Sequence, residues 1–360
     1  MRHLTKRFTT AFFVSMLSLT TGISFVFADE DPDTNWDSDD KDMPMFISDS
    51  NTGYIDSAII QTQFRMRVDS GSNNMVPDLA EFFYGACGCA RVVPNPPSNT
   101  PAPDGAVLNP SAPGPVGTVI PGAILTSPLI ETSLDYQELS FDFEYALQRN
   151  MSVFAEVPIR FVDGEIFGHD QGLGDIRIGA KWGLLDQSSS HLTAQLRAYL
   201  PTGDSEKGLG TDHTSIEPGL LFSSRLNEQW TIASELRYWF PIDGTNGRGT
   251  PFESEDYAGE ILRFGIGAGY DFNVSSQTRI SPIVELVTWK FLGGQVLTSA
   301  DGTPSKAAPM KVRGKIITNL KIGARASFGK QHSIFLGYGE PLTNFEFYDK
   351  IIRLELRTTY

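Results

Sequence analysis

The sequence predicts an all-β protein, a transmembrane antiparallel up-and-down β-barrel of about twelve strands. Three observations support this fold class. From residue 58 to the end, segments of about ten residues alternate apolar and polar side chains, as barrel strands do. No stretch after the N-terminus approaches the roughly 20 consecutive apolar residues of a membrane helix. The chain also contains 24 Phe and 11 Tyr, which suits the aromatic girdles of a membrane barrel.

Residues 1–28 are predicted to be a signal peptide. Arg2, Lys6 and Arg7 give a positive start, an apolar stretch follows, and Ala28 closes an acceptable cleavage site. A membrane-anchoring helix is the alternative, but the apolar stretch is short and acidic residues follow at once. We therefore expect export, with the cell outer membrane as the destination.

Residues 29–57 are predicted to form an acidic, disordered N-terminal segment. Acidic side chains are dense between Asp29 and Asp42, and their spacing matches no known calcium-binding loop. Such a run is most simply a solvated tail. The net charge of −14 argues against nucleic acid as a partner.

The barrel is predicted to span residues 58–360, beginning with a strand at about 58–68 and a long insertion at 69–130. The second half of the insertion is rich in Pro and cannot be regular strand. It also contains Cys87 and Cys89, which export would place in an oxidising compartment. A bridge across one residue is strained, so a disulfide within the pair, a disulfide to another chain, and free thiols all remain open. Two ligands do not make a zinc site, and we predict no metal and no cofactor.

The remaining strands follow from the same alternation with a period of two. Near residue 180, for example, Ile178 and Trp182 fall on one face, while Arg177 and Lys181 fall on the other. The predicted strands are about 132–145, 152–162, 173–184, 191–200, 215–226, 230–241, 260–272, 278–290, 315–328, 333–339 and 350–360.

The connections between these strands alternate between tight turns and long links. The long links are 163–172, 201–214, 242–259, 291–314 and 340–349. Outer-membrane barrels have short periplasmic turns and long external loops, so both termini are expected in the periplasm. The final amphipathic strand ends in Tyr360, which is similar to the ending that the barrel assembly machinery recognises. That machinery and outer-membrane lipid are therefore expected partners.

The side chains that point inward by this parity are the candidate functional residues. We predict lumen contacts from Arg65, Arg67, Arg177, Lys181, Arg197, Arg237, Arg325 and Arg353. Two interpretations are open: a lumen cross-linked by salt bridges with little pore, or a narrow aqueous channel whose arginines set an electrostatic preference. Twelve strands enclose more space than the eight of side-chain-filled barrels. This favours a channel, with the 69–130 insertion as the candidate for a constriction.

Evidence for an enzyme is thin. His213 and Ser215 form a His-x-Ser arrangement similar to that of outer-membrane phospholipase A, but Ile216 replaces that family's Asn. No Asn is placed to orient His213, so we expect an exposed loop histidine. We predict no enzymatic activity and no catalytic residue.

Three motifs carry a resemblance to a known family: residues 172–182 (GLGDIRIGAKW), 200–204 (LPTGD) and 208–211 (GLGT). Together they resemble the outer-membrane transporters named for the meta-pathway of phenol degradation, over about residues 130–360. Residues 80–84 with Cys87-Gly-Cys resemble a planctomycete-type variant of that family. The resemblance implies an outer-membrane barrel that passes aromatic or other hydrophobic compounds.

The sequence therefore predicts an outer-membrane channel or transporter for passive or facilitated diffusion of a small-molecule solute. The alternative is a non-transporting structural or adhesive barrel whose external loops bind a ligand.

Overall fold

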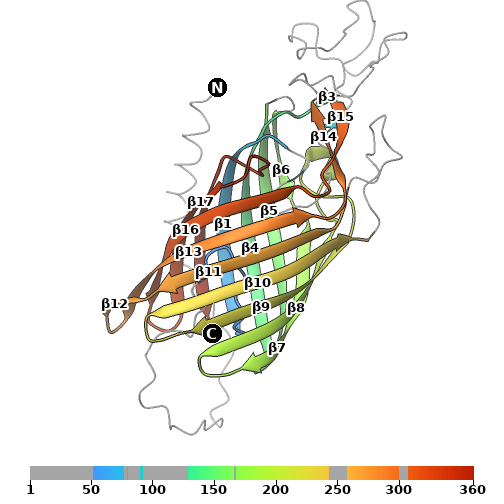
Figure 1. The fold of residues 1–360 in the computed structure, drawn as a ribbon. Helices are drawn as coiled ribbons and strands as arrows, with labels where there is room; N and C mark the ends of the chain where they lie inside the picture. The colour runs from blue at the N-terminus through green and yellow to red at the C-terminus, as the bar shows by residue number, and fades with distance from the viewer. Residues whose placement is uncertain are drawn as a thin grey trace, which may run out of the picture. The chain divides into compact units, whose positions relative to one another are not determined.

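The alternating segments form one closed antiparallel sheet (Figure 1). A computed structural model of the chain describes residues 52–76, 79, 90–91, 129–165, 168–242, 258–299 and 307–360. Its ring of twelve strands consists of β1 (Gln63–Asn74), β4 (Leu134–Gln148), β5 (Met151–Gly164), β7 (Ile176–Asp186), β8 (Ser190–Leu200), β9 (Ser215–Arg225), β10 (Trp230–Pro241), β11 (Ile261–Tyr270), β13 (Thr278–Phe291), β16 (Ile316–Phe328), β17 (His332–Pro341) and β18 (Lys350–Thr359). Pairing of β1 with both β4 and β18, and of β11 with β13, closes the ring and leaves no free edge.

Short secondary-structure elements lie within the links that connect the twelve strands. β6 (Gly168–Leu173) continues the hairpin of β5, and β12 (Phe272–Ser275) continues the pairing of β11 with β13. Two further pairs lie within predicted links: β2 (Ala90–Arg91) with β3 (Leu129–Ile130), and β14 (Gln295–Ser299) with β15 (Ala307–Lys311). The 3-10 turn η1 (Ser205–Lys207) lies between β8 and β9. In the part of the chain that the structure describes, no helix has the length and apolar character needed to span a membrane.

The first strand starts later than the sequence predicts. We expected it at 58–68, but β1 begins at Gln63 and continues to Asn74. The alternation before Gln63 does not belong to the wall, because residues 52–61 run inside the barrel. An ordered stretch thus reaches into the range predicted as the acidic tail. The predicted signal peptide, residues 29–51, Cys87, Cys89 and the Pro-rich run lie outside the described residues.

Successive side chains of each strand lie on opposite faces of the sheet, as the alternation in the sequence predicts. Along β13, Ile280, Val284 and Leu286 are exposed on the outer face, while Arg279 and Glu285 are buried on the inner face. Large apolar side chains are exposed in the same way around the ring, among them Phe143, Ile178, Leu196, Leu220, Leu236, Phe264, Ile266, Ile322 and Leu336. The outer surface of the barrel is therefore apolar, and most charges point inward.

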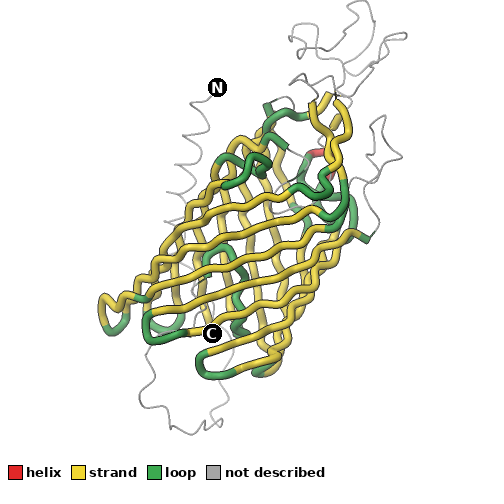
Figure 2. Tube along the Cα trace, in the orientation of Figure 1, coloured by secondary structure: helices red, strands yellow, loops and turns green. Residues whose placement is uncertain are grey.

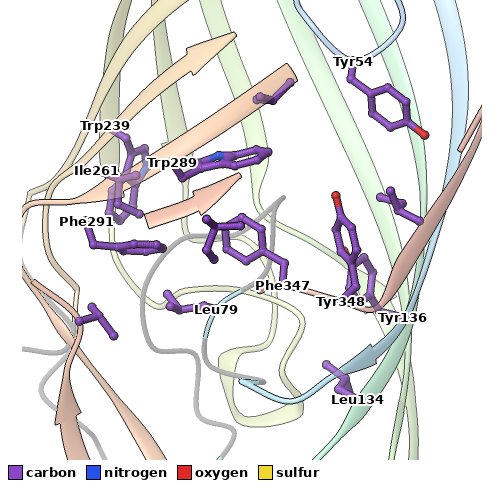
Figure 3. Close-up of a cluster of buried hydrophobic side chains, with 14 of the residues drawn as sticks. Tyr54, Leu79, Leu134, Tyr136, Trp239, Ile261, Trp289, Phe291, Phe347 and Tyr348 are labelled. Atoms are coloured by element: carbon purple, nitrogen blue, oxygen red, sulfur yellow. The ribbon is translucent and has the colours of Figure 1, made fainter. Parts of the chain in front are cut away.

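The interior changes character along its length. Towards the end with tight turns it is charged, whereas towards the end with long links it contains a hydrophobic cluster (Figure 3). Trp289 and Phe291 of β13, Trp239 of β10, and Phe347 and Tyr348 of the 342–349 link belong to this cluster. Inward positions near the long links are thus apolar, which the simple rule of a polar interior does not predict.

Candidate functional site: the barrel lumen

Residues 52–61, here called the lumen segment, occupy the inside of the barrel (Figure 2). The segment enters from the tight-turn end. There the hydroxyl of Thr62 accepts a hydrogen bond from the backbone N–H of Ala146, 3.1 Å away, close to the β4–β5 turn. From that point it contacts strands on several sides of the ring, as the following contacts establish. Residues just upstream of the first wall strand therefore lie inside the lumen.

Asp56 is the charged centre of the lumen segment. Its carboxylate lies 2.6 Å from a guanidinium nitrogen of Arg197 and 2.7 Å from one of Arg237. Both arginines also pair with the buried Glu217, at 3.3 and 3.2 Å. The two strands β8 and β10 thus hold one segment carboxylate between them, with each buried charge compensated.

The backbone of the lumen segment is satisfied by the side chains of the wall. Glu285 accepts hydrogen bonds from the N–H groups of Gly53 (2.9 Å), Tyr54 (2.6 Å) and Ile55 (3.3 Å). Wall side chains also donate to the segment's carbonyls: Arg325 to Thr52, Arg353 to Gly53, Arg263 to Tyr54, Lys181 to Ser57 and Thr193 to Ala58. A buried segment without a strand partner needs such contacts, because unpaired N–H and C=O groups are costly.

The N-terminal end of the lumen segment, at Gly53 and Tyr54, is closely packed against the wall. The ring of Tyr54 lies under two cations, 4.0 Å from the Lys321 Nζ and 4.1 Å from the guanidinium carbon of Arg353. Phe335 packs edge-on against the same ring. A Cβ on Gly53 would come within 2.3 Å of the Phe335 ring, so only glycine fits at position 53.

Five of the eight predicted lumen residues contact the lumen segment: Lys181, Arg197, Arg237, Arg325 and Arg353. The other three pair with acids of the wall. Arg65 lies 3.3 Å from Asp142, Arg67 lies 3.1 Å from Asp69, and Arg177 lies 3.1 Å from Glu138. All eight side chains point inward, and each is compensated by an acid or by a backbone carbonyl. Their proposed contact with a solute remains a prediction.

Aromatic side chains close the long-link end of the lumen. Trp289 packs edge-on against Phe347 at 5.1 Å between ring centres, and Phe291 packs against Phe345 at 5.9 Å. The amide of Asn319 donates a hydrogen bond to the Tyr348 hydroxyl at 2.7 Å. We call Trp239, Trp289, Phe291, Phe347 and Tyr348 the aromatic cap. Leu79, from the insertion expected to constrict the lumen, joins the same hydrophobic cluster (Figure 3).

The link after β8 is folded onto the wall through Asp175. The Asp175 carboxylate accepts hydrogen bonds from the Gly203 N–H (3.0 Å), the Thr211 N–H (2.9 Å) and the Thr211 hydroxyl (2.8 Å). Arg160 donates to the Leu209 carbonyl at 2.6 Å. The motifs at 172–182, 200–204 and 208–211 therefore meet in space and fix this link.

The expectation of an exposed His213 is wrong. Its side chain is buried next to Trp239, 5.8 Å between ring centres, and its Nδ1 lies 2.8 Å from the Thr211 carbonyl oxygen. Burial lowers the pKa of His213 below its usual 6.5, against the opposing effect of the Thr211 carbonyl. The link between β8 and β9 is folded onto the wall, and this places the His213 imidazole next to Trp239.

A small cavity beside the lumen segment is lined in part by Asp56, Arg65, Glu144, Lys181 and Arg197. Among the described residues, no group of three or more His, Cys, Asp or Glu side chains is placed to hold a metal ion. The arrangement is a charged barrel interior with a segment of the chain inside it.

Sequence reasoning missed several residues that lie inside the barrel. Asp56 and Tyr54 lie upstream of the first wall strand, where no alternation identifies them. Phe335 was recognised only as part of a strand. One feature could have pointed to the aromatic cap: the inward row of β13 changes from the charged Arg279 and Glu285 to Val287, Trp289 and Phe291, which indicates an apolar interior at that end.

The comparisons with known proteins bear on this same barrel. The family model described as "Putative MetA-pathway of phenol degradation" matches residues 131–338. This chain belongs to that family. The match spans β7 and the links that Asp175 joins, so the family's motifs coincide with the anchored mouth of the barrel. No match is found among curated proteins.

Solved membrane barrels are similar to this family member at low identity. An outer membrane channel from Pseudomonas putida F1 is 13% identical, with a TM-score of 0.47, over 86% of this chain and 99% of that one. The beta domain of the Bordetella autotransporter BrkA is 12% identical, with a TM-score of 0.43, over 83% and 100%. The KdgM porin is 9% identical, with a TM-score of 0.35, over 62% and 92%.

Proposed function

We propose that this family member is an outer-membrane channel for small molecules whose lumen is closed at rest by residues 52–61. The observation that carries the proposal is an apolar outer face around a charged interior, in which the described contacts of the lumen segment are with side chains of the wall. Such a segment can leave the lumen without breaking the hydrogen bonds of the barrel wall. The wall would then present a ring of arginines and carboxylates to water.

We place the tight turns in the periplasm and the long links outside the cell. This orientation follows from the alternation of link lengths, which is typical of outer-membrane barrels. It puts the lumen segment on the periplasmic side and the aromatic cap at the external mouth. Aromatic or other hydrophobic solutes suit such a mouth once it opens, because Trp289, Phe291 and Phe347, which are buried in the closed barrel, would then offer ring faces and edges for contact.

A specific observation also favours the rival function, a structural or adhesive barrel that transports nothing. The lumen is packed, with Arg160, Arg237, Arg325 and Lys321 among its most deeply buried side chains. A barrel that only anchors external links needs no free passage. Conductance separates the two candidates.

The test is planar-bilayer recording of the full chain beside the Asp56→Ala variant. Removing this carboxylate takes the shared partner from Arg197 and Arg237, so the segment should be released more often. We expect brief, small openings from the natural protein and a several-fold higher open probability from the variant. Asp186→Ala, which removes the contacts with Arg149 and His191 beside the tight turns and none with the lumen segment, is the control and should behave like the natural protein.

Heat-modifiable migration on gels shows whether each variant has folded and inserted. If a folded Asp56→Ala barrel and the natural protein are both silent in bilayers, the channel proposal fails and the structural role stands.

A further inference from the structure

The cations of this barrel divide into two groups. Inside the lumen, the arginines pair with acids at short distance. Six exposed cations, by contrast, have no ion pair with any residue that the structure describes: Lys290, Lys311, Arg313, Lys315, Lys330 and Lys350. Because exposed cations elsewhere, such as Arg149 and Lys207, do have acidic partners, this group calls for a different explanation.

Four of the six lie at one corner of the barrel, where β13 ends and β16 begins. The Phe291 N–H donates to the Lys315 carbonyl at 3.0 Å, and the Gly314 N–H donates to the Phe291 carbonyl at 2.8 Å. These contacts bring the backbone next to Lys290 against the turn that contains Arg313 and Lys315. Lys311 ends β15, which pairs with β14 directly above. We call Lys290, Lys311, Arg313 and Lys315 the basic rim.

The basic rim stands at the edge of the apolar outer face. Lys290 is exposed on the outer side of β13, in the same row as the exposed Leu286 and Val284. Its neighbour across the strand pair is Ile316, which is also exposed. Between Lys290 and Leu286 lies Thr288, which is hydrogen-bonded to Thr318 of β16. The charge thus lies above a short polar pair and then an apolar strip, an arrangement that suits a phosphorylated lipid, with the anionic headgroup above and the acyl chains below.

Three acids lie near this corner in the described part of the chain. Glu260 lies at the edge of β11, with its carboxylate near Gly293, and Glu340 of β17 accepts a hydrogen bond from the Tyr338 hydroxyl at 3.2 Å. Glu346 follows Phe345, whose ring centre lies 5.6 Å from the Lys315 Nζ. None of the three forms an ion pair with the basic rim among the described residues, so four cations face three acids there, although the whole chain has a net charge of −14.

We propose that the basic rim binds the phosphate groups of a lipid A-type headgroup in the outer leaflet. The inference rests on the proposed outer-membrane location and orientation, and it does not require conduction. The exposed strip below Lys290 receives the acyl chains, and the guanidinium of Arg313 and the three ammonium groups surround the phosphates.

The test is a native mass-spectrometry titration of the detergent-solubilised full chain with lipid A that carries both phosphates. Removing two cations near a charged surface should weaken binding about 30-fold. We therefore expect this loss for the double variant Lys290→Gln/Arg313→Gln. The control is Arg149→Gln/Lys330→Gln, which removes the same charge at the tight-turn end and should bind like the natural protein.

Parallel titrations with dephosphorylated lipid A and with inorganic phosphate distinguish the sources of affinity. Dephosphorylated lipid A should bind the natural protein as weakly as the intact lipid binds the double variant, and inorganic phosphate should not compete at equal concentration. Equal binding of the dephosphorylated lipid, or an equal loss in the control, overturns the proposal. Tight binding of inorganic phosphate alone would replace it with a soluble-anion site.

Should the first double variant fail to fold, Lys311→Gln/Lys315→Gln tests the same rim through residues outside the barrel strands. A barrel that is silent in bilayers but binds lipid A contradicts only the channel proposal. A conducting barrel without phosphate-dependent binding contradicts only this one.

Discussion

Asp56 connects the lumen segment to the wall by charge, and its surroundings explain why a charged lumen is stable. A buried guanidinium without a partner is strongly destabilising, whereas a compensated pair is tolerated. Arg197 and Arg237 each lie within 3.3 Å of Asp56 of the segment and of Glu217 of β9, and Arg237 also pairs with Glu235 of its own strand. Loss of the segment therefore leaves each arginine with Glu217, so release costs less than a complete loss of pairing.

His213 makes stability depend on pH. Since burial lowers the pKa of the folded His213, the unfolded chain binds a proton first as the pH falls. The free energy of unfolding should therefore drop as the pH falls through about 6.5 and level off below the folded pKa. Above that window the ring is neutral in both states and contributes no pH dependence.

Urea unfolding in lipid vesicles between about pH 8 and pH 5 measures this effect. His213→Gln should show a smaller decrease across the window than the natural protein. The exposed His332, replaced by Gln, serves as the control and should keep the full decrease. An unchanged slope in His213→Gln would rule out this origin.

At the scale of elements, the link between β8 and β9 depends on one carboxylate. Asp175 satisfies two backbone N–H groups and one hydroxyl that are otherwise remote from any strand partner. Asp175→Ala should leave the two N–H groups unsatisfied, at about 1–3 kcal/mol for each buried group, whereas the Thr211 hydroxyl can still donate to the His213 carbonyl. The link should then open more often while the ring of strands persists.

Hydrogen exchange followed by mass spectrometry checks this prediction. Peptides that contain Gly203 and Thr211 should lose protection in Asp175→Ala, and peptides of β10 should not. Asp204→Ala, which removes the exposed pair with Lys207, should leave the link protected. Equal loss of protection in both variants would mean that the link has another anchor.

The positions of the strands show which parts of the fold the sequence alone predicts. Trp230–Pro241 falls where the alternation places it, because each inward charge and outward apolar residue marks its face. The start of β1 does not, since Ile59 and Ile60 extend the apolar pattern into a segment that leaves the wall. A contact such as Asp56 with Arg237 joins residues far apart in sequence, and no local pattern specifies it. The hairpin β14–β15 was missed because its few residues lie in a link too long to assign.

At the scale of the whole molecule, the barrel is asymmetric along its axis. Its interior goes from ion pairs near the tight turns to the aromatic cap near the long links. Its outer face is apolar along the strands and bears the basic rim at one end. In the proposed channel, a solute that enters from the long-link end would meet the aromatic cap first and the charged side chains afterwards.

The exposed apolar face makes a prediction that only a membrane location fulfils. Ile266, near the middle of β11, and Leu226, next to the β9–β10 turn, are exposed by 49% and 60%. In water, an arginine at either position would be tolerated alike. In a bilayer, Ile266→Arg should destabilise the barrel by about 2–4 kcal/mol, because the charge lies near the midplane, whereas Leu226→Arg near the interface should cost about 0–1 kcal/mol. Reversible unfolding in guanidinium with lipid vesicles measures both values, and equal costs for the two variants would contradict a membrane-spanning barrel.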